Sequence, residues 1–289
     1  MTSAPFCDTL PALRLANPAV KITRRRFLTG LAAALGGYST LVEPQRLTLE
    51  RITAKLPGLA PSWEGLRIAV LSDFHLHPFT RLPHIQDAVN LANSLKPDLV
   101  VLLGDYVDAT VEAIYELAPE LASLNARLGV FGVLGNHDHW KGPKVVTEKM
   151  EAHGISMLRN RGITLPGPSG GLYLAGVDSA WNGHADLQRA MADRLGKDPA
   201  ILLVHEPDFA DRSAADGRVA LQLSGHSHGG QVRLPGIGAM RLPSFGCRYD
   251  MGTYHLRDMM LYTNRGIGLV DLPVRFNCPP EVTEVTLSA

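Results

Sequence analysis

Five short polar groups rich in histidine and aspartate are spread along the chain, and each follows an apolar run. They read SDFH, GDYVD, GNHDH, HEP and GHSHGG, and begin at Ser72, Gly104, Gly135, His205 and Gly225. Carboxylates, an amide oxygen and imidazoles suit divalent manganese, iron or zinc, and the absence of thiolates argues against a structural zinc site. A single group of this kind is more often a helix cap or a satisfied polar residue, so the interpretation depends on all five together.

The apolar runs before these groups have the length and composition of buried strands. Strands are predicted at 66–71, 98–103, 130–134, 172–177, 201–204, 219–223 and 259–262. Helices are predicted at 84–95, 145–153, 185–195 and 110–125, and Pro119 is expected to break or kink the last of these. Because the carboxyl ends of strands in α/β sheets converge on a crevice, the five polar groups are predicted to meet at one site.

Composition limits the classes of function. The 289 residues include 45% hydrophobic residues, 28 Lys+Arg and 28 Asp+Glu, so no charge excess attracts polyanions and no nucleic-acid partner is expected. Nothing within residues 46–289 reads as a linker, and one domain is predicted there. Cys7 precedes this domain, and Cys247 and Cys278 are interpreted as two independent buried thiols, although a pairing between them stays open.

Residues 1–45 are predicted to be a signal and linker, separate from the folded domain. Thr23 to Leu28 reads TRRRFL, which resembles the twin-arginine export pattern S/T-R-R-x-F-L; a basic turn before an ordinary helix is the alternative. The apolar run that follows is short and interrupted by glycines, so it is a poor membrane span. We expect export by the twin-arginine machinery and a periplasmic or cell-envelope location. Without a clear cleavage site, a cleaved signal and a retained membrane anchor both stay open.

The order D-x-H, G-D-x-x-D, G-N-H-D, H, G-H-x-H resembles that of the calcineurin-like metallophosphoesterases, and five motifs in one order are hard to obtain by chance. The resemblance runs from Leu66 to the C-terminus. The segments GGQVRLPG, YTNRGIG and PVRFN are similar to the exported bacterial phosphodiesterase branch of the YkuE/YaeI type. The resemblance implies a four-layer α/β/β/α sandwich of two mixed sheets flanked by helices.

The resemblance also implies a centre with two divalent metal ions, with Mn²⁺ favoured and Fe or Zn also suited. One ion would be held by Asp73, His75 and His228, the other by Asn136, His205 and His226, with Asp105 bridging both. Asp138 is expected to brace the loop that carries Asn136. The two ions would deliver a bridging hydroxide in line to phosphorus.

Further roles follow from the same resemblance. His137 is expected to protonate the departing oxygen or to stabilise the transition state, oriented by Asp108; a turn or helix cap is the alternative for Asp108. Asn264, Arg265 and Arg275 near the C-terminus are candidates for binding a second phosphate, with surface ion pairing as an evenly weighted alternative.

Three functions fit this pattern. The first is hydrolysis of phosphodiesters, or of phosphomonoesters, and the second is a UDP-2,3-diacylglucosamine pyrophosphatase-like hydrolysis of a nucleotide-linked lipid. A lipid substrate should require an apolar groove beside the metals, and the residues Trp140, Phe245 and Ile267 are too scattered in the sequence to predict one. The third is a non-catalytic metal-bound scaffold, which the complete ligand set and the GNH histidine disfavour.

Overall fold

A computed structural model describes residues 23–165, 167–168 and 170–289, which fall into two compact units divided between Gly36 and Gly37. The first unit contains most of helix α1 (Arg24–Gly37), and the second, Gly37–Ala289, is called the body here. Cys7 and residues 1–22 of the predicted signal lie outside the described residues. Within the described ranges, no helix is both long enough and apolar enough to cross a membrane.

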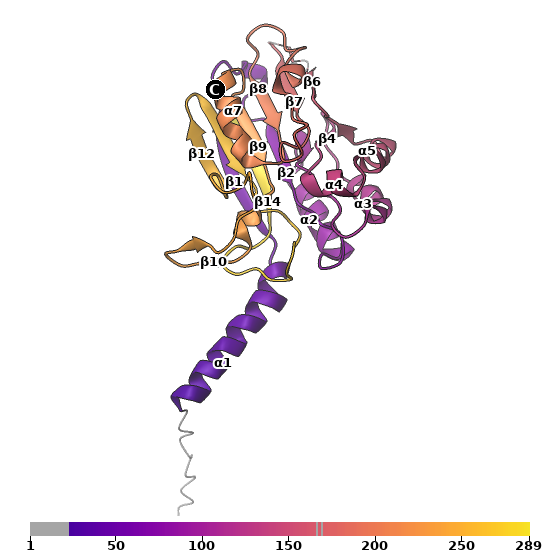
Figure 1. Ribbon diagram of the computed structural model, residues 1–289. Helices are drawn as coiled ribbons and strands as arrows, with labels where there is room; N and C mark the ends of the chain where they lie inside the picture. The colour runs from indigo at the N-terminus through magenta and orange to yellow at the C-terminus, as the bar shows by residue number, and fades with distance from the viewer. Residues whose placement is uncertain (1–22, 166, 169) are drawn as a thin grey trace, which may run out of the picture. The chain divides into compact units, whose positions relative to one another are not determined.

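Two six-stranded mixed sheets form the body (Figure 1). The first has the order β1 (Thr48–Lys55), β14 (Glu281–Ser288), β2 (Arg67–Leu71), β3 (Leu99–Leu102), β4 (Val130–Gly132), β5 (Ser156–Met157). The second has the order β12 (Gly252–Leu256), β13 (Met259–Thr263), β9 (Leu221–Ser224), β8 (Ala200–Leu203), β7 (Leu172–Gly176), β6 (Arg161–Leu165). Strands β2 to β5 run parallel, as do β7, β8, β9 and β13, and a ribbon of β10 (Arg233–Leu234) and β11 (Gly238–Ala239) lies outside both sheets.

Helices cover the outer face of each sheet. The first sheet packs on α2 (Leu82–Ser94), α3 (Ile114–Leu121) and α5 (Pro143–Ala152), and the second on α6 (Leu187–Ala190) and α7 (Ala210–Asp216). Between the sheets, buried residues of both, such as Val101 and Leu203, form one hydrophobic cluster. Shorter helical turns are η1 (Tyr38–Val42), η2 (Glu43–Gln45), η3 (Pro61–Trp63), η4 (Val111–Ala113), α4 (Asn136–Lys141), η5 (Pro207–Phe209) and η6 (His228–Gly230). The predicted four-layer sandwich is therefore confirmed.

Each of the seven predicted strands is present, with ends shifted by up to two residues. Pro119 does not break the helix, because α3 continues through it and ends at Leu121. The carbonyl that Pro119 leaves without its helical N–H donor belongs to Tyr115, an exposed residue, so water can replace the lost bond. The helix predicted at 185–195 is much shorter, since α6 starts beside the cap Asp186 and ends at Ala190.

Residues 37–45, predicted to belong to a linker, are part of the body and pack against its C-terminal segment. Glu43 is buried and accepts a hydrogen bond from the backbone N–H of Cys278, and the carbonyl of Ser39 accepts one from Arg275. The chain therefore joins the body beside the segment that precedes β14. The boundary at residue 45 and the signal role of residues 1–45 stay predictions.

Candidate metal centre

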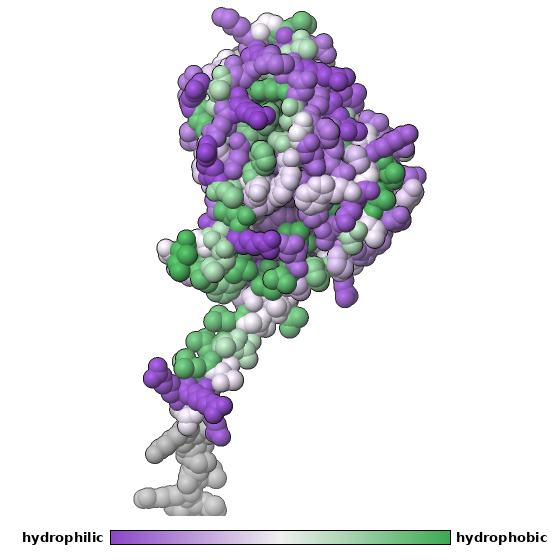
Figure 2. Space-filling view, viewed as in Figure 1, coloured by the Kyte–Doolittle hydropathy of each residue, from purple (hydrophilic) through white to green (hydrophobic). Residues whose placement is uncertain are grey.

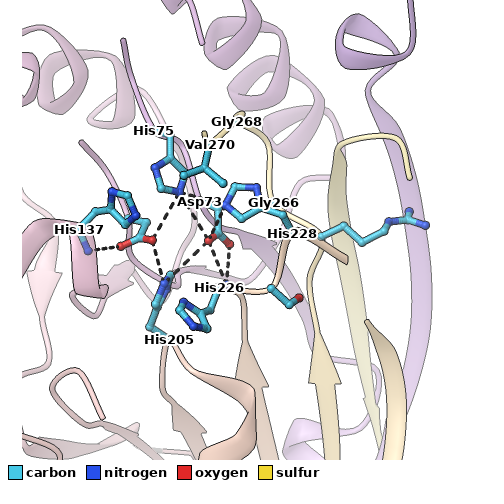
Figure 3. Close-up of polar contacts among 12 residues, drawn as sticks. Asp73, His75, His137, His205, His226, His228, Gly266, Gly268 and Val270 are labelled. Carbon is cyan, nitrogen blue, oxygen red and sulfur yellow. Dashed lines mark hydrogen bonds and ion pairs between the residues drawn. The ribbon is translucent and has the colours of Figure 1, made fainter. Parts of the chain in front are cut away.

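Predicted metal ligands from both sheets come together at the carboxyl ends of their strands (Figure 3). Asp73 and His75 follow β2, Asp105 follows β3, Asn136 and His137 follow β4, His205 follows β8, and His226 and His228 follow β9. The two sheets pack face to face, so their carboxyl edges contribute to one site. The backbone N–H of His226 donates to both carboxylate oxygens of Asp73 at 3.0 Å and so joins the two edges.

Three overlapping groups of ligand atoms lie within 4.8 Å of one another. They are Asp73, His75 and His228; His75, Asp105 and His137; and Asp105, His205 and His226. A single oxygen, Oδ2 of Asp105, lies 3.4 Å from Nε2 of His75 and 3.0 Å from Nε2 of His205. Asp105 therefore lies next to ligands of both predicted metal positions.

Several polar atoms in this cluster are buried without a hydrogen-bond partner, which tests whether the residues fit a metal. Oδ1 of Asn136 and Nε2 of His205 are both orphaned in this sense, since the contact of His205 with Asp105 lacks hydrogen-bond alignment. Nε2 of His75 faces Nε2 of His228 at 3.0 Å. Unpaired buried polar atoms are costly, and a divalent cation would satisfy oxygen and imidazole donors together. The donor set therefore fits divalent metal ions.

Backbone carbonyls fix the orientation of two of the imidazoles. Nδ1 of His205 lies 2.7 Å from the carbonyl oxygen of Leu103, and Nε2 of His226 lies 2.8 Å from that of Ser244. Each nitrogen donates its proton to the carbonyl, so the lone pair of the other ring nitrogen faces the cluster.

The pKa shifts of Asp105, His226 and His228 favour their metal-binding forms. Burial would raise the pKa of Asp105, but His205, His137 and His75 outweigh it and lower that pKa well below its ordinary value. Burial lowers the pKa of His228 well below its ordinary value, with His75 adding to the effect. Burial also lowers the pKa of His226. Ionised carboxylates and neutral imidazoles are the forms that bind metals. Burial lowers the pKa of His205, but Asp105 outweighs it and raises that pKa well above its ordinary value, so a metal would displace a proton from this ring.

The two loops that carry Asp105 and Asn136 are locked together by Asp138. Its carboxylate accepts hydrogen bonds from the backbone N–H groups of Asp105, Tyr106 and Gly135, each at 2.9 Å. Burial, with Asp105 adding, raises the pKa of Asp138 to about 6. A Cβ at position 135 would lie 2.1 Å from Oδ1 of Asp105, so only glycine permits this approach.

Strained backbone is concentrated at the same positions. Five predicted ligands have φ in the left-handed region: Asp73 (53°), His75 (42°), Asp105 (52°), His226 (70°) and His228 (51°). Such conformations cost about 1–3 kcal/mol each for residues other than glycine and cluster at functional sites. These sharp turns direct the ligand side chains toward the metal cluster. A relaxed strand end would direct them elsewhere.

His137 lies beside this cluster rather than within its predicted ligand set. Its Nδ1 is 3.0 Å from Oδ1 of Asp108, which also lies 3.7 Å from Nδ1 of His75. Burial lowers the pKa of His137, but Asp105 and Asp108 outweigh it and raise that pKa above its ordinary value. A histidine held protonated next to a metal cluster is suited to donate a proton.

The C-terminal residues predicted to bind a second phosphate have internal partners instead. Asn264 is fully buried and bonds to Thr283 and to the backbone N–H of Gly266. Arg265 pairs with Glu50 and with Glu281 at 2.5 Å.

Arg275, the third phosphate candidate, is also used internally. Its buried guanidinium donates to the carbonyl oxygens of Cys278, Arg265, Gly266 and Gly268. The structure thus corrects the prediction for all three residues, because their polar groups hold the chain together and none of them lines the cavity over the metal cluster.

That cavity, of about 630 Å³, contains residues that the sequence did not point to. It extends from the metal cluster to Trp140, Trp181, Met240, Leu242, Val270 and Leu272. Most of them stand in irregular loops, where no periodicity marks them. Trp140 was noted in the sequence, but only its place against the His137 ring, 4.8 Å between centroids, shows that it belongs to the site.

The two described cysteines are free thiols. Cys278 is buried, and its Sγ contacts the carbonyl oxygen of His228 at 3.2 Å. Cys247 is exposed, so the prediction that both thiols are buried was wrong for this one. It lies in the irregular segment between β11 and β12, which has no apolar periodicity.

Residues 66–230 match the calcineurin-like phosphoesterase family. The chain is 35% identical over 283 residues to the metallophosphoesterase YkuE of Bacillus subtilis, covering 93% of this chain and 99% of that protein. It is 32% identical over 275 residues to phosphodiesterase YaeI of Escherichia coli, covering 92% and 99%. The solved structure of sulfate thiohydrolase SoxB from Thermus thermophilus has a similar fold, with a TM-score of 0.50 and 11% identity over 78% of this chain and 57% of that one.

The chain therefore belongs to the calcineurin-like phosphoesterase family, as its motifs predicted. It is a metal-dependent phosphoester hydrolase, and its relatives over nearly the whole chain include the YkuE and YaeI proteins.

Proposed function

We propose that the protein is a binuclear metallophosphodiesterase. One divalent ion would be held by Asp73, His75 and His228, the other by Asn136, His205 and His226, with Asp105 between them. The observation that supports this proposal most strongly is the position of Oδ2 of Asp105, which lies within 3.4 Å of the facing nitrogens of both His75 and His205. A carboxylate placed in this way suits two ions a few ångströms apart.

Two bound divalent ions would supply an activated water near neutral pH and neutralise charge on the phosphoryl oxygens. The protein groups have separate tasks. Asp105 and the ligand imidazoles would hold the two ions, and His137 donates a proton to the departing oxygen. Asp108 contacts Nδ1 of His137 as an ion pair at 3.0 Å, without hydrogen-bond alignment, and Nε2 is the nitrogen left to face the substrate. Asp138 fixes the relative position of the loops that carry Asp105 and His137, because its carboxylate accepts backbone hydrogen bonds from both.

Diester hydrolysis is favoured over a scaffold role because the ligands, the proton donor and its orienting carboxylate all lie at one cavity. A nucleotide-linked or other lipid phosphoester is the second candidate substrate, and the apolar lining of the cavity favours it. Manganese is the proposed metal, and iron or zinc would suit the same donors.

We also propose that the protein is exported by the twin-arginine machinery to the periplasm or cell envelope. The motif from Thr23 to Leu28 supports this, and helix α1 begins inside it at Arg24. Changing both Arg24 and Arg25 to lysine should leave the protein in the cytoplasmic fraction. Continued export of this variant would contradict the proposal.

The direct test of the proposed activity uses the full chain loaded with manganese. A bis-aryl phosphodiester should be hydrolysed faster than the matching aryl monoester, and a chelator should abolish both reactions. Added manganese should restore them. If the protein binds two metals per chain and still cleaves neither ester, the general phosphodiesterase proposal fails.

A further inference from the structure

Exposed apolar side chains stand on segments that line the metal cavity and on segments that are hydrogen-bonded to them. Ile237 lies in the turn between β10 and β11, Met240 follows β11, and Leu272 stands in the segment before β14. Leu41 and Val42 are exposed in η1, where the chain joins the body. These five residues are called the apolar rim. Contiguous exposed apolar surface of this kind marks an interaction site in water-soluble folds.

Three chain segments carry the rim, and direct contacts hold them together. Arg233 of β10 donates its backbone N–H to the carbonyl oxygen of Phe276, and Gln231 bonds to Val270. The backbone N–H of Arg275 donates to Ser39, which precedes Leu41. The three segments therefore lie side by side, and Figure 2 shows hydrophobic side chains gathered at the end of the body that carries β10.

The charged groups within this surface compensate each other. Arg241 and Asp271 are both exposed and form an ion pair at 3.2 Å, and Arg233 pairs with Asp250 at 2.6 Å. The surface thus has no excess charge with which to select an acidic or basic partner. Its character is apolar.

The rim continues into the cavity, whose wall also carries the ion pair of Arg241 with Asp271. Met240 and Leu272 belong both to the rim and to the cavity wall, and Leu242, Val270 and Val274 extend that wall toward the metal cluster. The cavity therefore has a polar end, where the phosphoryl group would bind, and an apolar end that opens at the rim. A small water-soluble diester would have no use for the apolar end.

We propose that the apolar rim docks on a lipid bilayer, so that the cavity receives a phosphoester whose apolar part remains in the membrane. This inference rests on the proposed function and names its substrate class. A protein partner or a second copy of the chain seated on the rim would close the mouth of the cavity to substrate. A bilayer covers the same mouth and at the same time presents the substrate to it.

The test compares two rim substitutions with a matched control in the full chain. Ile237→Asp and Leu41→Asp change rim residues that are each 74% exposed, and Leu195→Asp changes a residue that is 73% exposed. Leu195 precedes β8, at the amino end of the strand, whereas the metal cluster lies at the carboxyl end. None of the three lines the cavity.

Each variant is measured in three ways after manganese loading. The first is turnover of a soluble bis-aryl phosphodiester, and the second is co-sedimentation with neutral phosphatidylcholine vesicles at low and high salt. The third is turnover of an aryl ester of phosphatidic acid in the same vesicles. Neutral vesicles reduce attraction to the arginines of α1, which are present in all variants.

The docking proposal predicts equal turnover of the soluble ester by all four proteins. Ile237→Asp and Leu41→Asp should each lower vesicle binding and vesicle-ester turnover roughly tenfold, the change expected when one inserted aliphatic side chain is lost. Leu195→Asp should match the wild type, and high salt should not weaken binding of the wild type.

Rim variants that bind vesicles and cleave the embedded ester like the wild type would overturn the proposal, as would wild-type binding that is lost in high salt. If the wild type cleaves neither ester, the proposed function has failed, while the vesicle-binding measurement still decides whether the rim docks.

Discussion

Two buried polar regions of this protein differ in how their polar atoms are paired. At the carboxyl ends of the strands, Oδ1 of Asn136 and Nε2 of His205 have no hydrogen-bond partner. In the segment before β14, Arg275 donates to four backbone carbonyls through its two terminal nitrogens, and only its Nε is left without a partner. Asn264 uses both ends of its amide. Both regions carry residue types that bind metals or phosphates.

The difference lies in where the polar atoms find partners. A buried group whose hydrogen bonds are mostly made to its own chain has little capacity left for a ligand, and its loss should affect folding. Buried groups that converge without partners must be satisfied by something bound, and their loss should affect chemistry. Substitutions in the two regions should therefore separate stability from catalysis.

The largest effect is expected for Asp105→Asn. It replaces the carboxylate shared by both metal positions with a neutral amide, so metal content should fall. Turnover should drop by about 10³-fold or more, because a bound cation contributes several kcal/mol to transition-state stabilisation. Metal analysis and diester kinetics measure this. Asp98→Asn, at the amino end of the same strand, is the control and should keep its metals. Full activity of Asp105→Asn would remove the basis for a shared bridge.

His137→Ala should keep both metals and lose about 10²- to 10³-fold in kcat, the range of a general acid. The loss should be greatest for esters with poor leaving groups, which need protonation most. His153→Ala, whose ring contacts only the carbonyl of Lys149 among the hydrogen bonds described, should behave as the wild type. Unchanged turnover of poor leaving groups by His137→Ala would show that this residue is not the acid.

Arg275→Met should lower the free energy of unfolding by about 2–5 kcal/mol, because it leaves buried carbonyl oxygens without donors. Denaturant unfolding measures this, and the folded fraction should keep its metals and lose less than about tenfold in turnover. The surface pair of Arg51 with Glu284 gives the control, since Arg51→Met should cost less than about 1 kcal/mol. A stable Arg275→Met protein that failed to bind substrate would reverse the comparison of the two regions.

Asp108→Asn should have the smallest effect, a loss of about tenfold in kcat together with a change in the pH profile. The carboxylate of Asp108 helps to raise the pKa of His137, so its removal lowers that pKa. An acid acts in its protonated form, so activity is lost as pH rises through its pKa. The loss should begin at lower pH in the variant than in the wild type. If the basic limb of the pH–rate profile did not change, Asp108 would have no effect on the proton donor.

Much of the fold and of the metal cluster could be predicted from the sequence because each ligand directly follows an apolar strand. Strand ends are local features, so a run such as LVVL before Gly104 and Asp105 places those residues without knowledge of the rest of the chain. The strand β14 was not predicted, because its apolar residues Val285 and Leu287 alternate with polar ones instead of forming a continuous apolar run.

The apolar rim and the role of Arg275 could not be predicted in this way. Ile237 and Leu272 come from segments far apart in sequence, and only the contacts of β10 with Phe276 bring those segments together. The sequence also does not show whether an arginine has carbonyl partners inside the protein or is available to a phosphate. Both features depend on tertiary contacts between irregular segments.

The central claim is that one carboxylate, Asp105, lies between two metal ions. Electron paramagnetic resonance of the manganese-loaded full chain, combined with metal analysis, tests it most directly. If Asp105 bridges the ions, the chain should bind two manganese ions with a magnetically coupled signal, and Asp105→Asn should remove that signal. One manganese per chain, or two with the signal of isolated ions, would contradict it.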